Sequence, residues 1–115
     1  MIIVPGMDNF KEMQVALYGD MFLSRGMALL VIDGPGQYES AVLNVHVSMQ
    51  AWMSTGKACV DWLTKRKEVD VARIGMSCTS FGTFFGTIAA AYEPRIKAVA
   101  ANKVCHEPGF RSEEH

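Results

Sequence analysis

The stretch Arg73-Ile74-Gly75-Met76-Ser77-Cys78-Thr79-Ser80-Phe81-Gly82 is the strongest indicator of the fold, because it joins an apolar run to a run of small residues. The apolar run predicts a buried strand over residues 72–77, and residues 80–92 predict a helix that ends before Pro94. A serine on such a sharp strand-to-helix turn has its hydroxyl lifted clear of the sheet. Ser80 is therefore a candidate nucleophile. The structural alternative is a serine that caps the helix N-terminus.

A second serine in the same stretch, Ser77, completes the shorter pattern Gly75-Met76-Ser77. We disfavour Ser77 as the nucleophile, because the apolar run places it inside the strand. In addition, Gly82 suits the close approach of helix and strand that follows a nucleophile at Ser80.

Outward from this stretch, strands and helices are expected to alternate along the whole chain. Apolar runs predict further strands over residues 1–4, 27–32 and 96–101. A helix is expected from Asp8 or Asn9 to about Arg25, with Glu12 near its N3 position and Gly26 ending it. Another is expected over residues 45–67, with Trp52 and Trp62 pointing to different sides. Each helix is expected to turn one stripe of apolar residues, its inner stripe, toward the core. These residues are Phe10, Met13, Leu17, Met21 and Phe22 in the first helix, and Met49, Trp52, Met53, Cys59, Val60 and Leu63 in the second.

This alternation predicts an α/β fold with a parallel sheet, right-handed crossovers and helices on both faces. Ligands of such sheets bind at the carboxyl ends of the strands. Three loops rich in Gly, Pro or small polar residues follow predicted strands, at residues 5–9, 33–40 and 78–82. We expect these loops to converge.

Composition indicates one small globular domain over residues 1–106, followed by a polar tail over residues 107–115. Half of the 115 residues are hydrophobic, a fifth are charged, and the formal net charge is −1. No basic stripe predicts a nucleic-acid partner, and no apolar run predicts a membrane span. The three cysteines and the lack of a signal peptide favour a cytoplasmic protein with reduced thiols. Cys105-His106 is too small a cluster for a metal site.

Four sequence elements carry a resemblance to a known family. They are Pro5–Glu12, which contains the pair Lys11-Glu12; Asp33–Gln37, followed by Glu39 and Ser40; the turn at Ser80; and Pro94–Val99. Together they resemble the α/β-hydrolase superfamily, and within it the branch of the fermentation-respiration switch proteins and dihydroxypseudooxynicotine hydrolase. The resemblance covers residues 1–101.

The resemblance implies a partial α/β-hydrolase fold and a serine hydrolase that acts on an ester, amide or activated carbonyl. Ser80 would attack the carbonyl carbon, and the backbone N–H groups of Met7 and Phe81 would hold the oxyanion. His106 is a possible base, with a loop histidine as the favoured alternative. Glu39 is a possible substrate contact, although a rigid turn is the favoured role of residues 33–37. No cofactor is implied.

The sequence departs from the family pattern at several points. Cys78 replaces the leading glycine of the turn, Thr83 follows Gly82 where glycine is usual, and Tyr38 stands where glycine is common. No aspartate follows Ser80, although the triad order in this fold is Ser, Asp or Glu, then His.

We therefore expect the acid and base to lie on sequence absent from this chain or on another chain. The abrupt start inside a strand also suggests a missing N-terminal part. The rival hypothesis is a truncated, non-catalytic module. Its exposed edge strand would associate with a partner or a second copy, which predicts an oligomer.

Overall fold

Four parallel strands and four helices are present in the part of the chain that the computed structural model describes, residues 1–6, 10–44 and 46–103. The predicted α/β class with a parallel sheet is confirmed. In chain order the elements are β1 (Ile2–Val4), α1 (Lys11–Leu23), β2 (Leu30–Val31), α2 (Tyr38–Val42), α3 (Met49–Leu63), β3 (Ile74–Thr79), α4 (Gly82–Ala91) and β4 (Ile96–Asn102).

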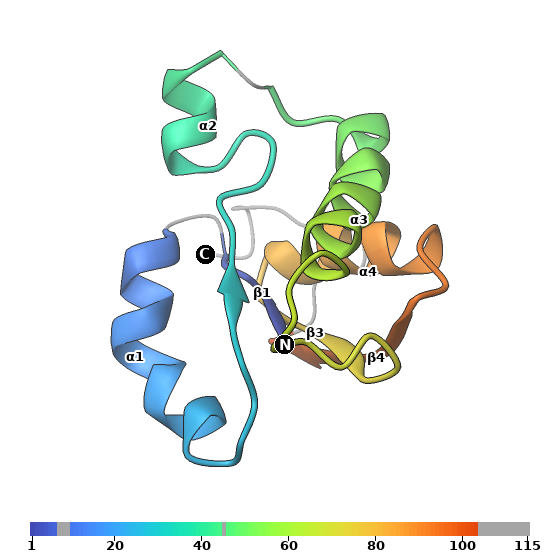
Figure 1. The fold of residues 1–115 in the computed structure, drawn as a ribbon. Helices are drawn as coiled ribbons and strands as arrows, with labels where there is room; N and C mark the ends of the chain where they lie inside the picture. Colours follow the sequence, from blue (N-terminus) through green and yellow to red (C-terminus); the bar gives the residue numbers. More distant parts are fainter. Residues whose placement is uncertain (7–9, 45, 104–115) are drawn as a thin grey trace.

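The first strand of the chain lies inside the sheet, whose order is β2-β1-β3-β4. Ile2 pairs with Leu30 of β2 on one side and with Met76 of β3 on the other. The chain moves outward from β1 to β2 and, in the opposite direction, from β3 to β4. Right-handed crossovers therefore place α1 and α4 on opposite faces. Figure 1 shows α1 beside β2, apart from α3 and α4.

The core lies between the sheet and the pair α3 and α4, because α3 packs on α4 and α4 packs on β3, β4 and β1. Trp52 of α3 is 1% exposed and stacks on Phe85 of α4 at 5.5 Å between ring centroids. Trp62 is 49% exposed, which confirms that the two tryptophans point to different sides. The other core residues include Ile2, Val4, Val60, Leu63, Ile74, Met76, Cys78 and Ala89.

An ion network joins α3 to the turn before β4. The Arg95 guanidinium donates to Glu93 Oε1 at 2.6 Å and to Asp61 Oδ1 at 2.8 Å. The Glu93 side chain is 6% exposed. Its bonds to Arg95 hold the pKa of the Glu93 carboxyl below its usual range, because they stabilise the ionised form.

The expected strand over residues 27–32 is much shorter than predicted. Only Leu30–Val31 is strand, both residues are half-buried, and Met27 is 41% exposed. The continuous apolar run indicated burial on both faces, but β2 lies at the edge of the sheet. An edge strand has a neighbouring strand on one side only, so its side chains are less buried than those of a central strand.

The first helix begins later and packs on another face than expected. Asp8 and Asn9 lie outside the described residues, and Phe10 is the N-cap without a side-chain cap. Gln14 and Gly19 are the buried positions, whereas Leu17 is 59% exposed. The predicted inner stripe is therefore wrong in part, because the two-residue β2 gives α1 little apolar surface to pack against.

The ends of the helices agree better with the sequence. Gly26 has a positive φ of 75°, and the Met27 N–H donates to Phe22 O at 3.1 Å, as expected of a glycine that ends α1. The second long helix, α3, starts at Met49. Ser48 is its N-cap, and the Ser48 side chain accepts a hydrogen bond from the Ala51 N–H at 3.0 Å. Met49 is 58% exposed, so it is not part of the inner stripe. Helix α2 was not predicted.

The last strand of the sheet is largely exposed. In β4 only Ile96 is buried, and all six residues 97–102 are exposed. Within the described residues β4 pairs with β3 alone, so it is the exposed edge strand that the sequence led us to expect. None of the helices in the described residues has the length and apolar character needed to cross a membrane. The predicted tail, 107–115, lies outside the described residues.

Candidate functional site

Ser80 lies between β3 and α4 in the strained backbone conformation of a sharp turn. It is exposed and has a φ of 54°, which is the left-handed region that costs a residue with a Cβ about 1–2 kcal/mol. Its N–H donates to Asn102 O at 2.9 Å, and its O accepts from the Thr83 N–H at 2.9 Å. Phe81 is the N-cap of α4, and no side chain caps that helix. The alternative role of Ser80 as a helix cap is therefore wrong.

The residues that depart from the family pattern each have a structural explanation. The Cys78 thiol is fully buried and fits because Gly86 faces it, since a Cβ on Gly86 would overlap the sulfur. The Thr83 hydroxyl donates to Ser80 O at 2.7 Å, so this side chain helps to fix the turn. Tyr38 has a φ of 33°, which explains why glycine is common there.

Two of the three predicted loops meet at Ser80. A Cβ built on Gly6 would lie 3.3 Å from Ser80 Cβ and 3.9 Å from Ser80 Oγ. A Cβ built on Gly82 would overlap Pro5 O, so the start of α4 rests on the same loop. Gly6 and Gly82 therefore allow the loop after β1 and the turn after β3 to touch.

The third loop is joined to the first through Gln37. Its Nε2 donates to Pro5 O at 2.8 Å, and its Oε1 accepts from the Gly34 N–H at 2.8 Å. From α3, the indole N–H of Trp52 donates to Pro35 O at 3.2 Å. The predicted convergence of the three loops at the carboxyl ends of the strands is confirmed for their described residues. Residues 33–37 form a hydrogen-bonded turn, and its rigidity stays a prediction.

A cluster of charged groups lies beside these loops. Lys11 Nζ is 2.9 Å from Asp33 Oδ2 and 2.7 Å from Glu39 Oε2, and the Lys11 N–H donates to Asp33 Oδ1 at 2.9 Å. Hydrogen bonds to Glu39 and then Asp33 raise the pKa of Lys11. Asp33 therefore caps α1 from a distant loop. The Glu39 carboxylate is bound to Lys11, and its contact with substrate stays a prediction.

The two described cysteines are unsuited to act as nucleophiles. Both thiols are free, and burial raises the pKa of Cys78 to about 12 and that of Cys59 to about 11. Because the thiolate is the reactive form, both remain inert thiols near neutral pH. Ser80 is the exposed group at this turn.

Met7 and His106 lie outside the described residues, so their predicted roles stay predictions. Phe81 follows Ser80 directly at the start of α4, the position expected of an oxyanion donor. The Gln37 bridge and the bonding of Lys11 to Asp33 were not predicted. The sequence did contain a signal for these contacts, because Gln37, Lys11 and Asp33 all belong to the motifs Pro5–Glu12 and Asp33–Gln37 that carry the resemblance.

Comparison with known proteins supports the hydrolase interpretation at the level of the family. The family X-Pro dipeptidyl-peptidase (S15 family) matches residues 6–107. The matched region begins at Gly6 and includes the loops over residues 33–40 and 78–82, with the Ser80 turn. No curated protein and no solved structure matches the chain. Because the match covers most of the sequence, the chain belongs to the X-Pro dipeptidyl-peptidase (S15) family, a member of the α/β-hydrolase clan.

Proposed function

We propose that this chain carries the nucleophile of a serine hydrolase, with Ser80 forming an acyl-enzyme. The observation that supports it most is the exposed serine at φ 54° between β3 and α4, in contact with the loop after β1. The left-handed backbone conformation is energetically unfavourable for serine. A serine that adopts it at an exposed turn therefore favours a functional role.

In the proposed reaction, Ser80 Oγ attacks the carbonyl carbon of an ester, amide or activated acyl group. A histidine base takes the hydroxyl proton and returns it to the leaving group, and water then releases the acyl group. The N–H groups of Phe81 and Met7 would hold the oxyanion, each contributing about 2.7–4 kcal/mol to lowering the barrier. His106 is the candidate base within this chain.

The name of the matched family points to a peptide amide as the substrate class. The motifs Asp33–Gln37 and Lys11-Glu12 instead favour the branch of the fermentation-respiration switch proteins and dihydroxypseudooxynicotine hydrolase. Both alternatives share the acyl-enzyme at Ser80, so the nucleophile can be tested before the substrate is known.

The test is labelling with a fluorophosphonate probe, followed by mass spectrometry to locate the adduct. We expect stoichiometric labelling at Ser80, loss of labelling in Ser80→Ala, and retention in Ser77→Ala, the matched control at the neighbouring serine. His106→Ala separates a base within the chain from one supplied by another chain. An unlabelled sample with a native circular dichroism spectrum would contradict the proposal.

A second candidate is a non-catalytic module that associates through β4. The exposed residues 97–102 favour it, because an edge strand with free backbone groups is a template for pairing. Sedimentation of the chain and of Val99→Lys tests this idea. We expect a dimer or larger species that dissociates in the variant, and a monomer at high concentration would contradict it.

A further inference from the structure

Strands β3 and β4 end side by side at the carboxyl edge of the sheet. Their ladder runs to the pair Thr79 and Asn102, and the Ser80 N–H donates to Asn102 O at 2.9 Å. Lys103 follows Asn102 directly, so its backbone lies next to that of Ser80. Neighbouring strands are about 4.7–4.9 Å apart, and a lysine ammonium stands on a flexible four-carbon stem. The Lys103 ammonium can therefore reach a molecule bound at the Ser80 hydroxyl.

Lys103 shares the unusual backbone conformation of Ser80. Its φ is 57°, beside 54° at Ser80. This left-handed region is unfavourable for a residue with a Cβ, and glycine or asparagine adopts it more readily. The turn itself therefore gives no reason for a lysine. Backbone strain next to a candidate nucleophile favours a functional role for the side chain.

The charge of Lys103 is unpaired within the described part of the chain. Its side chain is exposed, and it forms no ion pair with any described residue. The carboxylates of Asp33 and Glu39 are bound to Lys11 and lie beyond β2. Because the strand order is β2-β1-β3-β4, β4 lies at the opposite edge of the sheet from them. The β4 side of Ser80 therefore offers a cation to a bound molecule.

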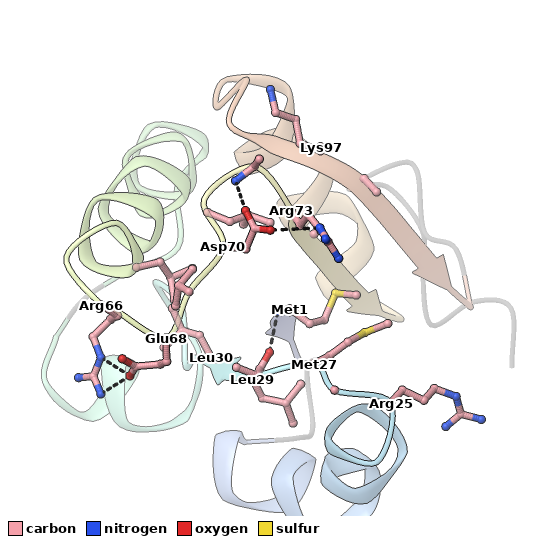
Figure 2. Close-up of a pocket in the computed structure, with 18 of the residues that line it drawn as sticks. Met1, Arg25, Met27, Leu29, Leu30, Arg66, Glu68, Asp70, Arg73 and Lys97 are labelled. Atoms are coloured by element: carbon pink, nitrogen blue, oxygen red, sulfur yellow. Dashed lines mark hydrogen bonds and ion pairs between the residues drawn. The ribbon is translucent and has the colours of Figure 1, made fainter.

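The cations at the other end of the strands differ in position or in pairing. A pocket of about 690 Å³ opens at the amino edge of the sheet, and Figure 2 shows two arginines at its margin, each paired with a carboxylate. Lys97 of β4 is also exposed and lines this pocket. Six residues of strand place it about 20 Å from Lys103. Lys97 is therefore a lysine of the same strand that lies out of reach of Ser80.

We propose that Lys103 selects acyl substrates that carry a carboxylate, an inference that rests on the proposed acyl transfer at Ser80. The ammonium binds a carboxylate at the far end of the acyl chain while Ser80 Oγ attacks the carbonyl carbon. Lys103 forms no covalent bond and transfers no proton, so its role is to bind the substrate. The substrate class is the ester or amide of a short dicarboxylic acid, cleaved at one end and held by the free carboxylate at the other.

The first experiment compares two esters that differ by one charge. They are mono-4-nitrophenyl glutarate, which is an anion, and its methyl ester, which is neutral. After subtraction of spontaneous hydrolysis, we expect a higher kcat/KM for the anion, through a lower KM. An exposed ion pair corresponds to about a two- to five-fold effect, so Lys103→Asn should lower the anion-to-neutral ratio of kcat/KM by about that factor.

Further variants separate the charge from the backbone strain. Asparagine tolerates the left-handed conformation, so Lys103→Asn removes the charge and keeps the turn. Lys103→Arg keeps the charge and should retain the ratio. Lys103→Gly should raise the free energy of unfolding because it relieves the strain, yet lose the preference as Lys103→Asn does. Lys97→Asn is the matched control and should leave the ratio unchanged.

A binding measurement tests the same contact without acyl transfer. The Ser80→Ala chain is titrated with glutaramate, a monoanion, and with neutral glutaramide, and binding is followed by NMR chemical shifts. We expect tighter binding of glutaramate, and loss of this difference when Lys103→Asn is added. Anion-selective binding together with an unlabelled Ser80 in the unmodified chain would refute the acyl transfer and not the carboxylate contact. Equal binding of the two amides, or an unchanged kcat/KM ratio in Lys103→Asn, would overturn the role of Lys103.

Discussion

Gly6 lies directly against Ser80, and a Cβ on Gly6 would be 3.3 Å from Ser80 Cβ. The two residues are far apart in sequence but adjacent in space, because β1 and β3 are neighbouring parallel strands and each loop follows the carboxyl end of its strand. The contact means that the loop before Met7 and the turn that carries Ser80 are held as one unit.

Replacing Ser80 by glycine should stabilise the fold relative to alanine at the same position. The φ of 54° disfavours any side chain with a Cβ, whereas glycine adopts it freely. We expect Ser80→Gly to exceed Ser80→Ala by about 1 kcal/mol in the free energy of unfolding, measured by denaturant titration. Equal stability of the two variants would show that the turn is relaxed.

Alanine at two glycines should have opposite effects. Gly82→Ala would place a Cβ against Pro5 O and should destabilise by about 1–3 kcal/mol. Gly19→Ala in α1 meets only Val15 at an ordinary 3.7 Å and should stabilise by up to about 1 kcal/mol. Thermal unfolding of both variants checks this pair, and undiminished stability of Gly82→Ala would contradict the packing described for Gly82.

Removing the Gln37 side chain should loosen the loops around Ser80. Gln37→Leu leaves the Gly34 N–H and Pro5 O without their partner, and each unsatisfied group costs about 1–3 kcal/mol when buried. Gln37→Glu keeps the acceptor for Gly34 but loses the donor to Pro5. A carboxylate oxygen would also face the Pro5 carbonyl oxygen. We expect both variants to lower the unfolding free energy, and unchanged stability of Gln37→Leu would contradict the bridge.

The buried cysteines should resist alkylation in the native state. Because the pKa of Cys78 is about 12 and that of Cys59 about 11, the thiolate fraction is small at pH 8 and rises only at strongly alkaline pH. In a Cys105→Ser variant, Ellman's reagent should detect no fast-reacting thiol at pH 8 and two thiols after denaturation. Fast reaction of the native protein would mean that one of these side chains is accessible.

Acid should weaken the network of Glu93, Arg95 and Asp61. The pKa values of both carboxyls are lowered, chiefly by Arg95 at Glu93 and by Lys57 then Arg95 at Asp61. A group with a lowered folded pKa stabilises above its unfolded value, near 4.5 for Glu93, and the contribution is lost as the pH falls through the folded value. Glu93→Gln should therefore show a smaller loss of unfolding free energy below pH 4.5 than the unmodified chain.

The sequence predicted the fold where the local pattern and the tertiary environment agree. The strand before Ser80 and the helix after it were recognised because the sequence changes from apolar residues to small residues at a single point. The loop over residues 33–37 was recognised because Gly and Pro define a turn with few alternatives.

Prediction failed where burial depends on distant partners. The run over residues 27–32 is apolar enough for a central strand, yet β2 is an edge strand of two residues. Gln14 is buried and Leu17 is exposed, because the face that α1 presents is decided by the short strand beneath it. Hydropathy alone contains no information about strand order.

The sequence predicted which loops form the site but not the hydrogen bonds that join them. Ser80, Gly6 and Gly82 follow from the motifs, but the bridge from Gln37 to Pro5 joins groups from two loops. Pairing over such a separation depends on the crossover geometry, which periodicity does not encode. Tyr38 is a related case, since a φ of 33° at a tyrosine has no local signature.

The central place of β1 has a consequence for the order of events during synthesis. Strand β1 finds its two neighbours only when Leu30 and then Met76 have been made. At about 5–20 residues per second, that second partner is made on the order of 4–15 s after Ile2. Until then Ile2, Ile3 and Val4 lack their neighbour on the β3 side, so the nascent chain depends on late folding and on whatever shields this apolar strand.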